Sequence, residues 1–77
     1  MSIVHPSQTA TRQIEQLVAD EDLAVTDLLN ACEDYCEAVA SAEPERAEDA
    51  QRARNRAKSR LSTIHERLKK AVTELLA

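Results

Sequence analysis

The sequence predicts an all-α protein, an antiparallel two-helix hairpin with helices over about residues 7–42 and 44–76 that assembles as a dimeric four-helix bundle. Three observations support this prediction. Apolar residues recur every three or four positions, which is the period of an amphipathic helix. The chain contains no glycine, so left-handed backbone angles and tight hairpin loops are disfavoured. Pro44 interrupts the helical pattern near the middle of the chain.

The segment Ser41-Ala42-Glu43-Pro44 is the predicted corner. Proline lacks an amide hydrogen and its ring clashes with the preceding turn, so the first helix should end before Pro44. Glu43 precedes the proline and is therefore biased away from helical angles. Pro44 suits the first position of a new helix, where Glu45 favours the positive end of the helix dipole. We therefore expect the chain to fold back at this point.

The first helix carries an apolar stripe that is wider than one partner helix needs. One heptad row, interrupted by Glu21, is the predicted seam, and a second row of smaller residues runs beside it. The acidic cluster 20–22 offers a three-helix alternative, which ranks second because the register is the same on both sides of the cluster. The seam row is Ile14, Val18, Val25, Leu28, Cys32, Tyr35, Val39 and Ala42, and the second row is Leu17, Ala24, Ala31 and Ala38.

The second helix has a small inner row near the corner, with Ala47, Ala50, Arg54 and Ala57, and larger residues beyond it. Two helices of roughly 50 Å bury little apolar surface when they pack only on each other. The wide stripe should therefore pack against the stripe of a second copy. A homodimeric antiparallel four-helix bundle is the simplest closed solution. The expected self-association residues are Leu17, Val25, Leu28, Leu29, Tyr35, Leu61, Ile64 and Leu68.

Charged residues provide a separate test of the fold-back. Antiparallel packing about Glu43 brings acidic residues of the first helix beside arginines of the second, and such exposed pairs select the register more than they stabilise it. The expected neighbours are Asp20 with Arg67, Asp27 with Arg60, and Asp34 with Arg52 or Arg56.

Three polar residues fall on the seam. Glu21 and His65 should face one another, and we expect this buried pair to set the helix alignment rather than to act in catalysis. Arg54 should pack its aliphatic stem near Tyr35 and Cys32 and extend its charged head into water.

Two further features could carry chemistry. Cys32 and Cys36 lie one helical turn apart on one face, where thiolates could bind copper or zinc. A zinc site needs four ligands, however, so packing as small apolar residues is the favoured interpretation and a thiol metal-binding bundle is an alternative. No cofactor is expected. The basic segment Arg52, Arg56, Lys58 and Arg60 suggests nucleic-acid binding as another alternative, which the net charge of −4 and the scarcity of aromatic residues disfavour.

The expected function is that of a non-enzymatic helical interaction module, an adaptor or regulator, that self-associates and binds a protein partner. No group of residues combines a nucleophile, a base and oxyanion donors, so an enzyme is not expected. No apolar run is long enough to cross a membrane, and the expected location is the cytoplasm. Residues 1–6, with a solvated His5, should form an arm, and residues 7–77 a single domain.

Overall fold

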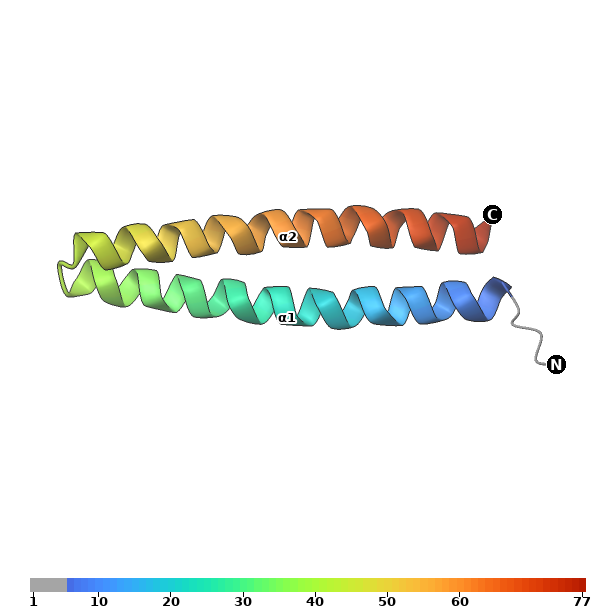
Figure 1. Ribbon diagram of the computed structural model, residues 1–77, viewed down its shortest axis with the longest axis horizontal. Helices are drawn as coiled ribbons and strands as arrows, with labels where there is room; N and C mark the ends of the chain where they lie inside the picture. The colour runs from blue at the N-terminus through green and yellow to red at the C-terminus, as the bar shows by residue number, and fades with distance from the viewer. Residues whose placement is uncertain (1–5) are drawn as a thin grey trace.

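The computed structural model describes residues 6–77, with side chains described from Thr9 onward. It contains two helices, α1 (Pro6–Ala40) and α2 (Pro44–Leu76). The helices lie side by side and run in opposite directions, with the corner at one end of the hairpin (Figure 1). This confirms the predicted all-α hairpin. The acidic cluster 20–22 lies inside a continuous α1, so the three-helix alternative is wrong. Pro6 already belongs to α1, and His5 lies outside the described residues.

The corner is tighter than the sequence indicates. Helix α1 ends at Ala40, two residues before the predicted end, and Ala42 adopts a φ of 53°. The Glu43 amide donates to the Ala38 carbonyl at 2.9 Å, and the Ala42 amide donates to the Val39 carbonyl at 3.1 Å. These two bonds form a Schellman motif, in which glycine usually occupies the left-handed position. Contrary to the expectation from its lack of glycine, the chain makes a tight turn with an alanine there.

We expect Ala42→Gly to raise the free energy of unfolding by about 1 kcal/mol, because glycine adopts a positive φ without the steric cost that a β-carbon imposes. Urea denaturation followed by circular dichroism measures this change. The matched control is Ala19→Gly at an exposed position inside α1, which should lower the free energy of unfolding by about 1 kcal/mol. Equal destabilisation by both substitutions would show that Ala42 does not need the left-handed conformation.

The core between the helices consists mainly of small side chains. Among the residues whose side chains are described, six of the eight buried ones are alanines, and each helix contributes a row with a spacing of seven residues that faces the other helix. The largest apolar contacts lie toward the open end, where Leu17 and Ile64 pack with Ala24 and Ala71. The buried residues are Leu17, Ala24, Ala31 and Ala38 of α1 and Ala50, Ala57, Ile64 and Ala71 of α2.

The row that the sequence favoured as the seam is therefore displaced from the helix contact. Val18, Val25 and Val39 are 43%, 39% and 56% exposed, whereas the row of smaller residues beside them is buried. Apolar spacing defines a stripe but does not tell which line within it faces the other helix. Alanine allows two backbones to approach closely, so the contact forms along the alanines and leaves the larger side chains to one side.

Candidate interaction surface

The buried rows divide the surface of the hairpin into two flanks. Residues three positions after or four positions before a buried residue lie about 40–60° to one side of the contact. Residues one or four positions after, or three positions before, a buried residue lie about 40–100° to the other side. We call the first side the charged flank, and it comprises Asp20, Asp27, Asp34, Arg46, Arg60 and Arg67. We call the second side the apolar flank, and it comprises Ile14, Val18, Val25, Leu28 and Val39 of α1 with Leu61, Leu68, Val72 and Leu75 of α2.

The charged flank joins the helices by ion pairs. Arg60 Nη1 lies 3.2 Å from Asp27 Oδ2, which confirms one predicted pair. The expected partner of Asp34 was wrong, because Asp34 pairs with Arg46 at 3.3 Å. Arg46 lies on the same heptad line of α2 as Arg60, whereas Arg52 lies off that line and approaches acidic residues of its own helix. The third expected pair, Asp20 and Arg67, lines one shallow groove together.

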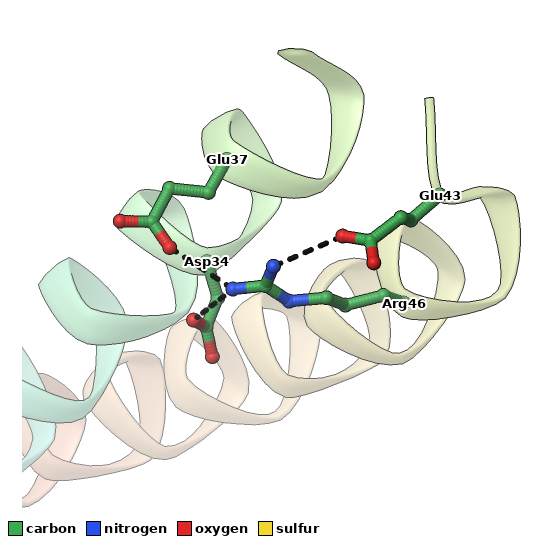
Figure 2. A network of polar contacts seen from close by, with 4 residues as sticks. All are labelled: Asp34, Glu37, Glu43 and Arg46. Atoms are coloured by element: carbon green, nitrogen blue, oxygen red, sulfur yellow. Dashed lines mark hydrogen bonds and ion pairs between the residues drawn. The ribbon is translucent and has the colours of Figure 1, made fainter. Parts of the chain in front are cut away.

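Arg46 ties the end of α1 to the beginning of α2 (Figure 2). Its Nη1 donates to Glu43 Oε2 at 3.0 Å, and its Nη2 donates to Glu37 Oε2 at 2.9 Å and to Asp34 Oδ1 at 3.3 Å. The hydrogen bond to Glu43 is the largest cause of a raised pKa for Arg46, followed by those to Glu37 and Asp34. All four side chains are exposed, so this network favours the observed position of the corner but adds little to the stability of the fold.

We expect Arg46→Leu to lower the melting temperature slightly in dilute buffer and to have almost no effect in 1 M salt. The reason is that the screening length falls to about 3 Å at that concentration. Thermal denaturation at the two salt concentrations measures the difference. Arg56→Leu, which removes an exposed arginine from the same helix, is the control and should show a weaker salt dependence. If the melting temperature fell by the same amount at both salt concentrations, Arg46 would act through packing.

The apolar flank is the larger hydrophobic surface. Val72 and Leu75 are exposed together with the three valines of α1, while Leu28, Leu61 and Leu68 are half-buried on the same side of the alanine contact. Among the described residues, no large side chain is fully buried. The hairpin thus buries mainly alanines and leaves its valines and most of its leucines at least partly exposed. An exposed apolar surface of this kind typically binds another one.

Polar groups cross the apolar flank at two levels. The first is the predicted contact of His65 Nε2 with Glu21 Oε2, which is confirmed at 2.7 Å. Their side chains are 58% and 30% exposed, so the hairpin by itself does not bury this pair. The pair lies beside the alanine contact rather than within it.

The second polar level is Arg54. Its guanidinium carbon lies 5.3 Å from the centre of the Tyr35 ring, and its Nη1 donates to Gln51 Oε1 at 2.9 Å. Its Nε is buried and has no hydrogen-bond partner. The expectation that the charged head extends freely into water was therefore wrong, because stacking on Tyr35 holds the guanidinium against the protein.

The residues predicted for self-association separate into three groups. Leu17 and Ile64 are buried inside the hairpin, and Leu29 is 63% exposed farther round α1. The other five lie on or beside the apolar flank. The apolar flank also contains Val18 and Val39, which were predicted on the seam row but not among the self-association residues, and Val72 and Leu75. The five are Val25, Leu28, Tyr35, Leu61 and Leu68.

The residues proposed for metal or nucleic-acid binding are not gathered into one site. Cys32 is partly buried and Cys36 is exposed, and both thiols are free. Across the part of the chain that the structure describes, no three His, Cys, Asp or Glu residues are placed to hold a metal ion. Arg56 shares a groove with Asp27 and Asp34, so acidic groups accompany the basic segment. Lys58 is exposed.

Neither of the two described helices is long and apolar enough to cross a membrane. No family model, curated protein or solved structure matches the chain. Its function must therefore be inferred from the geometry of its surface.

Proposed function

We propose that this chain is a non-enzymatic helical interaction module that self-associates through the apolar flank to form a homodimeric four-helix bundle, and that the bundle acts as an adaptor or regulator by binding a protein partner. The observation that carries this proposal is the contrast between the alanine core and the exposed apolar flank. Burying a valine or leucine side chain contributes about 1.5–3 kcal/mol, whereas an alanine has only one methyl group to bury. The hairpin alone therefore leaves unrealised much of the free energy that burial of its valines and leucines could contribute.

The dimensions of the flank suit such an interface. Two helices of about 50 Å by 10 Å each present a face of about 1,000 Å² per copy. A standard specific interface buries about 800 Å² per partner. Small helical domains commonly gain their stability from assembly when their own core is small. A second copy of the chain supplies a matching apolar flank of the same length.

A protein partner would then meet the surface that remains outside the dimer. Leu23 is 65% exposed and lies beyond the charged flank, away from the surface proposed for self-association. An isolated leucine surrounded by charged residues offers a partner one apolar anchor with a polar rim, which is the usual composition of a non-obligate interface.

Sedimentation equilibrium of the purified chain tests the self-association. We expect a mass twice that of the 8.5 kDa chain at micromolar concentration. A single species of 8.5 kDa over the whole range would overturn the proposal. Binding to a labelled oligonucleotide that weakens steeply with salt would instead support the nucleic-acid alternative, because phosphate contacts release counterions.

A further inference from the structure

The apolar flank has a direction, because its polar groups lie at two different heights. Glu21 and His65 form one layer across the hairpin, 2.7 Å apart. Arg54 lies eleven residues before His65 on α2, about 16 Å nearer the corner. The flank therefore carries the Glu21 carboxylate, in contact with His65, in one layer and the Arg54 guanidinium in another, with Val25, Leu28 and Leu61 between them.

Two copies can place these flanks face to face in only two simple ways. If both corners lie at the same end, each layer meets its own copy, so two Arg54 side chains share one layer and two Glu21 side chains share another. Like charges in a partly desolvated layer are unfavourable. If the corners lie at opposite ends, each Arg54 enters the layer of the other copy's Glu21, and both charges are matched at once.

The ends of the hairpin agree with the second arrangement. At the corner the surface is hollowed, and the hollow is lined by Ala38, Val39, Ala42, Glu43, Pro44 and Ala47. Val72 and Leu75, whose side chains are exposed, lie toward the open end of the hairpin, which is opposite the corner in Figure 1.

Heptad spacing brings these two ends together. Ala47 lies seven residues before Arg54, and Val72 lies seven residues after His65. The alignment that matches Arg54 with Glu21 therefore also places the hollow of one copy against Val72 of the other. The register chosen by charge thus brings an exposed valine of one copy to the apolar hollow of the other.

We propose that the occupant of the apolar flank is a second copy of this chain in antiparallel orientation, with Arg54 of each copy paired to Glu21 of the other and the two-fold axis passing near Val25, Leu28 and Leu61. This inference rests on the proposed self-association and specifies its geometry. The corners of the two hairpins then lie at opposite ends of the bundle.

Charge reversal tests the register. Glu21→Lys and Arg54→Glu should each weaken the dimer by about tenfold or more, because each places two like charges in both layers. The double variant Glu21→Lys/Arg54→Glu restores opposite charges between the copies and should dimerise within about threefold of the original chain. Sedimentation gives the dissociation constants, and circular dichroism confirms that each variant is helical. A double variant that dimerises no better than the single ones would overturn the register.

A distance measurement tests the orientation without altering the flank. Ser41→Cys in a Cys32→Ser/Cys36→Ser background places one spin label at each corner. Pulsed electron resonance should give a separation of about 40 Å for the antiparallel dimer, whereas corners at the same end would lie within about 20 Å. A dimer with the short distance overturns this inference alone. A monomer of 8.5 kDa with no interspin distance overturns the proposed self-association as well.

Discussion

Ala24→Leu is expected to lower the free energy of unfolding by about 1–3 kcal/mol, although leucine is more hydrophobic than alanine and forms helices well. Ala24 is completely buried and packs with Leu17, Ile64 and Ala71. The helices are in contact through its methyl group, so three additional carbon atoms must either push the helices apart or force strained rotamers. Urea denaturation at fixed protein concentration measures the loss.

Ala19→Leu is the matched control for this prediction. Ala19 is exposed on the same helix, so the same change of side chain should alter the free energy of unfolding by less than about 0.5 kcal/mol. If Ala24→Leu were as well tolerated as Ala19→Leu, the alanine row would not be the line of helix contact.

Val25→Asp is expected to raise the dissociation constant of the dimer by about a hundredfold or more. The valine is 39% exposed in the hairpin and lies near the proposed two-fold axis, so symmetry brings two aspartates into the apolar interface together. Burying an unpaired carboxylate costs several kcal/mol, and about 2.7 kcal/mol already corresponds to a hundredfold change in affinity. Sedimentation should show a monomer at concentrations where the original chain is dimeric.

The control for this effect is Leu23→Asp. It removes a larger apolar side chain and adds the same charge, but it lies off the apolar flank and is 65% exposed. We expect the mass of this variant to equal that of the original chain. Dissociation by Leu23→Asp, or an unchanged dimer with Val25→Asp, would show that the copies meet through another surface.

Long-range contacts proved predictable where they depend only on chain direction and helical rise. Once the corner is placed at Pro44, an antiparallel return makes Asp27 a neighbour of Arg60 and Glu21 a neighbour of His65, and both contacts are present. Arg46 was missed as the partner of Asp34 because two residues must lie on the same side of the hairpin as well as at the same height along it. Comparing heights along the helix axis does not test on which side of the hairpin a residue lies. The signal was present in the spacing of Arg46, fourteen residues from Arg60.

The sequence by itself determined that this chain forms two helices, where it turns, and which residues stand level with one another, because proline chemistry and helical periodicity are local properties. Only the tertiary structure decided which line of the broad apolar stripe becomes the contact and that Ala42 closes the corner at a positive φ. The contact line depends on how closely two backbones can approach, whereas the conformation of Ala42 depends on the capping hydrogen bonds of the corner. The distance between the backbones is set by the alanines of both helices acting together, so it cannot be read from either helix alone.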